Sequence, residues 1–278
     1  MYRINFLLRL LAVVIVLTSA AVPATAQTQL SPELQGKIDK LATDALARSG
    51  VPSASVAVVK DGRIAYLKAY GNAKIEPKTL ATPEMRYSIG SISKQFTAAA
   101  VLLLQEQRKL TLDDKVAKYI PDLTRANEVT IRQLLSHTSG YQDYWPQDYV
   151  MPMMLQPVTP QKILEMFAHK DLDFDPGTKW QYSNTNYVIA GVIVEKVSGM
   201  PLLEFLQKNV FTPLGMKSTS YRFADYSKAK NRALLHVQVD GKWIAKNTRN
   251  PDAQAPAASV SAAGRAARSA SGRRSRSG

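Results

Sequence analysis

Hydrophobic residues recur at helical spacing near the start of the chain, and β-rich segments follow. Ser31-Pro32 opens a segment whose apolar residues keep this spacing up to Gly50, which predicts a helix. Residues 54–60 and 63–70 are rich in β-branched and aromatic residues, and Asp61-Gly62 between them is a strong signal for a two-residue hairpin turn. A helix followed by a β-hairpin is therefore predicted for the first part of the chain.

The middle of the chain has a mainly helical pattern. Residues 93–107 (SKQFTAAAVLLLQEQ) are apolar on nearly every face and contain neither proline nor glycine, which is typical of a buried helix. The same reasoning predicts further helices at 130–135, 159–168, 186–197 and 201–209, and a second hairpin over 237–244. An early hairpin followed by helices favours an α+β fold whose sheet is completed by strands late in the chain.

The two ends of the chain differ in composition from the rest. Residues 1–26 contain early arginines, an apolar run and Ala24-Thr25-Ala26, which is the layout of a secretory signal peptide. We expect cleavage after Ala26, a periplasmic or secreted protein and no stable membrane anchor, because the run is shorter than the roughly 20 apolar residues that span a bilayer. Residues 257–278 are expected to be a disordered, basic, low-complexity tail, and a reading-frame shift near Ala257 is one hypothesis for its composition.

The basic excess lies partly at these ends. The chain has 36 Lys+Arg against 22 Asp+Glu, a formal charge of +14, but two of the basic residues lie in 1–26 and five in 259–278. The remainder, 27–258, has a charge of +7 and no basic stripe interleaved with aromatic residues, so we expect no nucleic-acid partner. The absence of cysteine excludes disulfides, thiolate zinc sites and a cysteine nucleophile. No two of the three histidines have metal-ligand spacing, so neither a metal nor a cofactor is expected.

The sharpest chemical signal is Ser91-Ile92-Ser93-Lys94, at the start of the buried helix. A serine hydroxyl is a poor nucleophile and needs a base within hydrogen-bond reach. Residues three apart on a helical turn share a face, so the Lys94 amine can reach the Ser91 hydroxyl. The alternative is that Ser91 only caps the helix. A second Ser-x-x-Lys, Ser227 to Lys230, lies in a polar stretch with no apolar helix behind it and is interpreted as a surface feature.

Tyr182-Ser183-Asn184 is the second candidate element, between a Pro-Gly turn and an apolar helix. A phenol beside a lysine can serve as a base, and a carboxamide can donate to a substrate carbonyl. Taken alone, this motif slightly favours a core tyrosine and a helix-capping asparagine. Tyr70-Gly71-Asn72 repeats the pattern at a strand end before the serine, and we interpret it as a decoy. Together with Ser91 and Lys94, the order and context of Tyr182 and Asn184 favour a catalytic function.

These motifs resemble those of the serine β-lactamase and penicillin-binding-protein superfamily, in the branch of class C β-lactamases, D,D-peptidases and related esterases. Segments such as YSIGSISKQFTAAAVLLL, VTIRQLLSHTSGY and FDPGTKWQYSNTNYVIAGVIVEKVSG extend the resemblance over about residues 31–258. It implies a β-lactamase/transpeptidase-like α+β fold, with an antiparallel sheet flanked by helices and a helical subdomain. It also implies that Ser91 is the acylated nucleophile, that Lys94 and Tyr182 share proton transfer, and that Asn184 holds the substrate amide.

The third motif of that family, Lys-Thr-Gly or His-x-Gly on a late strand, does not occur in this sequence. We therefore expect residues 27–256 to be an incomplete, C-terminally truncated domain that lacks late strands of the sheet. The resemblance implies an exported, cofactor-free serine hydrolase that acts on a β-lactam, a D-Ala peptide of the peptidoglycan type or a small ester. The alternatives are a catalytically inactive module that binds the cell envelope and a non-functional truncated product.

The segment from His137 to Trp145 is expected to lie beside the same pocket. His137 is interpreted as shaping this loop, because Lys94 already fills the role of base. Tyr141, Tyr144 and Trp145 either line the substrate cleft or pack in the core, and the sequence leaves both open.

Overall fold

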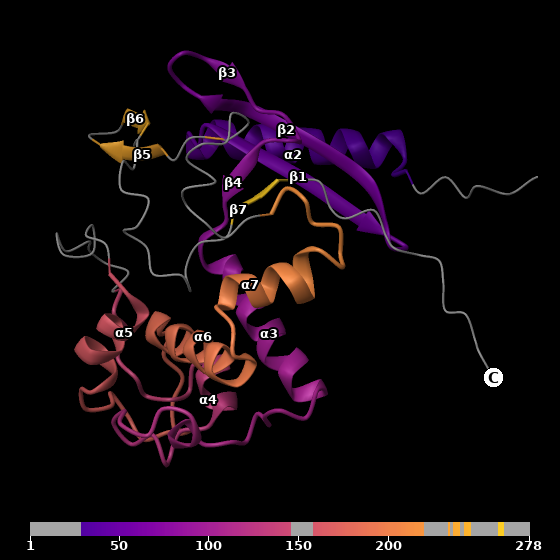
Figure 1. The fold of residues 1–278 in the computed structure, drawn as a ribbon. Coiled ribbons are helices and arrows are strands. Elements are labelled where there is room, and N and C mark those ends of the chain that lie inside the picture. Colours follow the sequence, from indigo (N-terminus) through magenta and orange to yellow (C-terminus); the bar gives the residue numbers. More distant parts are fainter. Residues whose placement is uncertain are drawn as a thin grey trace, which may run out of the picture.

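The computed structural model describes residues 29–145 and 158–219, with Ala233 and the short segments 236–239, 242–245 and 261–263. Figure 1 shows helix α2 (Pro32–Ser49) beside a small sheet at one end of the molecule and a group of shorter helices at the other. Helix α3 (Lys94–Glu106) leads from the sheet into the helical half. The signal peptide predicted for 1–26 and the second Ser-x-x-Lys motif lie outside the described residues.

The predicted N-terminal helix and hairpin are confirmed. The Ser31 side chain caps α2 by accepting a hydrogen bond from the Leu34 N–H at 3.3 Å, and Gly50 ends the helix in the left-handed region with φ 67°. Strand β1 (Ser53–Lys60) pairs antiparallel with β2 (Arg63–Lys74) across a turn in which both central residues, Asp61 and Gly62, have positive φ. This is the left-handed backbone that a two-residue hairpin turn requires. The short strand β3 (Thr79–Leu80) completes this three-stranded sheet in the order β1-β2-β3.

A second strand pair leads directly to the start of α3. Strand β4 (Arg86–Ser88) runs antiparallel to β7 (Ser261–Ala263), and a 3-10 turn over Gly90–Ser93 joins β4 to α3. Strand β7 lies inside the segment assigned from sequence to the tail. Pairing in a ladder uses backbone donors and acceptors, so a composition poor in apolar residues does not prevent it. The remaining prediction about 257–278 concerns residues that lie outside the described part of the chain.

The helical half contains the helices predicted from periodicity. They are α4 (Ile131–Leu135), α5 (Pro160–Ile163) with a π-helical turn over Leu164–Ala168, α6 (Asn184–Ser198), and α7 (Leu202–Leu206) with a π-helical turn over Gln207–Phe211. A 3-10 turn at Val116–Lys118 and the predicted late hairpin of β5 (His236–Val239) and β6 (Lys242–Ala245) complete the described elements. None of the described helices is long and apolar enough to cross a membrane.

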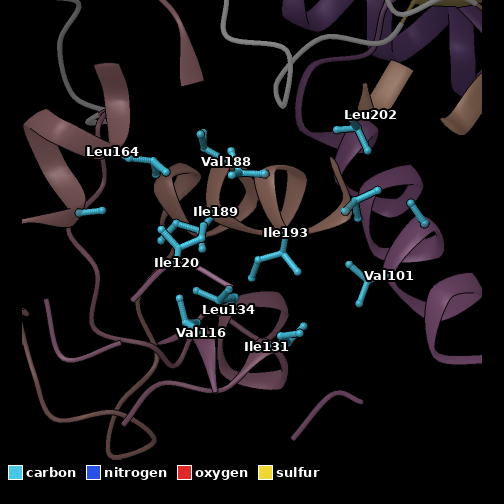
Figure 2. Close-up of a cluster of buried hydrophobic side chains, with 14 of the residues drawn as sticks. Val101, Val116, Ile120, Ile131, Leu134, Leu164, Val188, Ile189, Ile193 and Leu202 are labelled. Carbon is cyan, nitrogen blue, oxygen red and sulfur yellow. The ribbon is translucent and has the colours of Figure 1, made fainter. Parts of the chain in front are cut away.

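Helix α6 is the centre of the hydrophobic core. Its first eleven residues are all buried, which matches its pattern of apolar residues on every face. Figure 2 shows Ile189 and Ile193 of α6 among side chains from α4 and from the segment before it, with Val101 of α3 on one side. Because α3 and α6 pack against each other, the first turns of both helices are held in fixed positions beside the core.

Candidate active site

Ser91 lies in the 3-10 turn that precedes α3, and its side chain is open to solvent. Gly90 before it has φ 49°, a left-handed conformation that favours glycine and lets the chain turn from β4 into the helix. The exposed hydroxyl at the N-terminal side of α3 is accessible to a substrate. Sequence reasoning placed Ser91 at a helix entrance, and the structure confirms this position.

Lys94 is the first residue of α3, and its amine is buried beneath Ser91. The residue is 7% exposed, and its Nζ donates to Ser91 Oγ at 3.1 Å and to Asn184 Oδ1 at 2.7 Å. The aromatic rings of Tyr182 and Tyr187 also face this nitrogen, with centroids at 5.0 and 5.6 Å. Hydrogen bonds and aromatic faces together replace the contacts with water that a buried amine loses.

Tyr182 completes the group from a segment 91 residues away in the sequence. Its hydroxyl shares a 2.6 Å hydrogen bond with Ser91 Oγ and also lies 3.4 Å from Asn184 Oδ1. The Ser91 oxygen is therefore in contact with two groups that can take up or return a proton, the Lys94 amine and the Tyr182 phenol. All four residues singled out from sequence are brought together at the junction of α3 and α6.

Asn184 begins α6 and does not only cap it. The helix was predicted to start at residue 186, but Ser183 is the N-cap residue and makes no capping bond through its side chain. Asp143 provides the missing acceptor from a separate loop, because its Oδ1 accepts the Asn184 backbone N–H at 2.9 Å. The same carboxylate accepts the Asn184 side-chain amide with both oxygens, each at 3.1 Å.

Asp143 was not singled out from sequence. The available signal was a lone acidic residue within the aromatic segment that follows His137. Its partner lies 41 residues further along the chain, so no local pattern identifies the contact. The role assigned to Asn184, holding a substrate amide, stays a prediction.

His137 has a backbone φ of 59° and lies against the ring of Tyr182, with centroids 4.6 Å apart and planes 31° from parallel. Its Nδ1 accepts the Ser183 N–H at 3.2 Å, which places the ring proton of the neutral form on Nε2. Burial, assisted by the positive charge of Lys94, lowers the pKa of His137 to about 4. A neutral ring packed on the tyrosine agrees with a role in shaping the loop.

The aromatic residues after His137 pack in the core. Tyr141 and Tyr144 are 2% and 8% exposed, and Trp145 packs against the same cluster. Of the two possibilities left open by the sequence, packing is therefore the one found. The decoy Tyr70 has its hydroxyl on Asp39 of α2, so it helps to attach that helix to the sheet. In the part of the chain that the structure describes, no group of three His, Asp or Glu residues could hold a metal ion.

Comparison with known proteins identifies the family. The family model for β-lactamase matches residues 38–273, most of the chain. This chain belongs to the β-lactamase family. The resemblance inferred from Ser91, Lys94 and Tyr182 is thereby confirmed, and so is the implied β-lactamase/transpeptidase-like α+β fold.

Three relatives illustrate this membership. Protein flp of Staphylococcus aureus (strain N315) is 33% identical over 215 residues, which cover 74% of this chain and 42% of the relative. The octameric penicillin-binding protein homologue from Pyrococcus abyssi has a TM-score of 0.72 and 29% identity, covering 82% of this chain and 53% of that one. D-amino acid amidase from Ochrobactrum anthropi SV3 has a TM-score of 0.72 and 28% identity, and the match covers 83% of this chain and 67% of the amidase. The β-lactamase-family chain described here thus spans less than half the length of the first relative.

Proposed function

We propose that this chain is an exported serine hydrolase that forms an acyl-enzyme on Ser91 with an amide or ester substrate. One observation carries the proposal. The Ser91 hydroxyl is exposed to solvent, yet its oxygen is hydrogen-bonded to both the buried Lys94 amine and the Tyr182 phenol. A serine that only capped a helix would not require these two groups on its side chain.

The arrangement supports a two-step acyl transfer. As Ser91 Oγ bonds to the substrate carbonyl carbon, its proton passes to whichever of the two groups is in its basic form, the neutral Lys94 amine or the Tyr182 phenolate. The same pair returns a proton to the leaving nitrogen or oxygen as the carbonyl bond to it breaks. Water then attacks the Ser91 ester, and its proton follows the same route until the serine hydroxyl is restored and a carboxylic acid is released.

Three substrate classes are compatible with this chemistry: a β-lactam, a D-Ala peptide of the peptidoglycan type, or a small ester. Each has a carbonyl open to attack by an exposed hydroxyl. The relatives whose names mention penicillin binding or a D-amino acid amide favour an amide over an ester. The export part of the proposal rests on residues 1–26, and N-terminal sequencing of the mature protein tests it, with Gln27 expected as the first residue.

The proposal is tested by covalent labelling of the full chain. We expect a fluorescent penicillin or a fluorophosphonate to label the protein with a mass increase that maps to Ser91. Ser91→Ala should abolish the label. Ser227→Ala, in the second Ser-x-x-Lys motif, is the matched control and should leave the label unchanged.

The alternatives predict different results. A folded chain that binds envelope fragments but takes no label on Ser91 would be a binding module. A chain that lacks a cooperative unfolding transition would be a non-functional product. Either result contradicts the proposed hydrolase.

A further inference from the structure

The Asp143 carboxylate forms an unusual concentration of hydrogen bonds beside the proposed catalytic group. Its Oδ1 accepts the backbone N–H groups of Trp145 at 3.0 Å and Asn184 at 2.9 Å. The side-chain amide of Asn184 donates to both carboxylate oxygens. Asn184 is itself 7% exposed, so its amide has little water available as an alternative partner.

This contact determines which end of the Asn184 side chain faces Lys94. A carboxamide has an NH₂ that only donates and an oxygen that only accepts, while an ionised carboxylate only accepts. With Asp143 on one side, the NH₂ must face the carboxylate. The oxygen then faces Lys94 Nζ, 2.7 Å away. The reverse orientation would oppose an oxygen to the carboxylate and an NH₂ to the lysine amine, leaving both sides unpaired.

Building on the function proposed above, we propose that Asp143 is a positioning residue for acylation. It fixes the Asn184 carboxamide as an acceptor, and this amide holds the Lys94 amine against the Ser91 hydroxyl. Asp143 itself touches neither Ser91 nor the substrate. Its negative charge at the first turn of α6 also stabilises the helix end.

Asp143→Asn separates positioning from helix capping. The asparagine keeps an oxygen that can accept the N–H groups of Asn184 and Trp145, but its NH₂ now faces the NH₂ of Asn184. The Asn184 amide is then free to turn its oxygen away from Lys94. We expect the maximal acylation rate by the fluorescent penicillin to fall about 10- to 100-fold, with the concentration for half-maximal rate unchanged within about twofold.

Asn184→Ala provides the background that tests the mechanism, because it leaves no amide to orient. If Asp143 acts through this amide, Asp143→Asn should change acylation by less than about threefold in the Asn184→Ala chain. An equal loss in both backgrounds would show that Asp143 is only structural, and no loss in the wild-type background would also overturn the proposal. Melting temperature, measured in parallel, reports the contribution of Asp143 to the stability of the fold.

A matched control uses the same substitution at an exposed acidic residue. Asp44 forms a 2.6 Å salt bridge with Lys40 of the same helix α2, so Asp44→Asn should leave acylation unchanged. Failure of the two proposals can be told apart. A wild-type chain that takes no label contradicts the hydrolase function, and the positioning role falls with it. A labelled wild-type chain with a fully active Asp143→Asn variant contradicts the positioning role alone.

Discussion

At the scale of single residues, Tyr182 depends on a neighbour, His137, that performs no proton transfer in the proposed reaction. The His137 ring supports the Tyr182 ring from one side, and its Nδ1 fixes the backbone of Ser183, the residue between Tyr182 and Asn184. Protonation would place a hydrogen on Nδ1 opposite the Ser183 N–H and a positive charge near Lys94. Burial, first of all, and the positive charge of Lys94 oppose the charged imidazole and lower its pKa.

This pKa predicts an acid sensitivity of the fold. The imidazole has a pKa near 6.5 in an unfolded chain and about 4 in the structure, so the unfolded chain binds more protons between these values. Stability should therefore decrease as the pH falls from about 6.5 to about 4, with no further contribution from His137 below that. Urea unfolding at pH 7 and pH 4.5 measures the difference. In His137→Gln the loss should be smaller than in wild type.

His169→Gln is the control for this experiment. His169 is 41% exposed and lies 3.7 Å from Asp122 at the surface, so its substitution should preserve the wild-type acid sensitivity. If His137→Gln loses as much stability as wild type over this interval, the buried neutral imidazole is not the cause.

At the scale of elements, the site is built where two helices begin. Lys94 starts α3 and Asn184 starts α6, and the two helices pack against each other through the main hydrophobic cluster. Their hydrophobic patterns were sufficient to predict both helices, because a segment that is apolar on every face has to be buried. The start of α6 was predicted two residues late, because the carboxylate that accepts the Asn184 N–H belongs to the distant Asp143. A tertiary hydrogen bond of this kind leaves no local sequence signal.

The same limit explains the other differences between prediction and structure. Strands β3 and β4 have two and three residues, too few for an alternating pattern to be recognised. The helices predicted at 159–168 and 201–209 are present, but each changes to a π-helical turn within its length. Nothing in the spacing of apolar residues separates such a turn from a continued α-helix. Ser91, Lys94 and Tyr182 could be proposed from sequence because each lies in a short local motif, and the structure brings the three side chains together.

Packing between α3 and α6 should set the stability of the site. Ile193 is fully buried in α6, and Figure 2 shows it facing the same cluster as Val101 of α3. Ile193→Ala removes buried methyl groups and leaves a cavity, and should reduce the free energy of unfolding by about 2–5 kcal/mol. Urea unfolding measures this loss. Leu102→Ala, at a position of α3 that is 45% exposed, should change stability by less than about 1 kcal/mol. Equal effects of the two substitutions would contradict this account of the core.

At the scale of the whole molecule, the helical half and the α2–sheet half are stabilised by different kinds of contact. The helical half has a continuous hydrophobic core, but α2 contributes no buried residue, and Leu41 on it is 66% exposed. A polar cluster around Asp39 connects α2 to the sheet. Asp39 accepts hydrogen bonds from the hydroxyls of Tyr66 and Tyr70 on β2 and from the Lys68 amine.

This contrast predicts that α2 opens without the rest of the fold. Local opening requires little free energy where few apolar contacts are lost, so backbone amides of α2 should exchange with deuterium much sooner than those of α6. Asp39→Asn should accelerate exchange in α2 while leaving α6 and acylation of Ser91 unchanged. Because its tyrosine and lysine partners hold the pKa of Asp39 near 2, below its usual 3.8, the stabilisation it provides should persist above pH 4 and disappear as the pH falls towards 2. Hydrogen-exchange mass spectrometry of the wild type and of Asp39→Asn measures the exchange rates of α2 and α6 separately. Equal protection of α2 and α6 would mean that α2 is held by contacts other than this carboxylate.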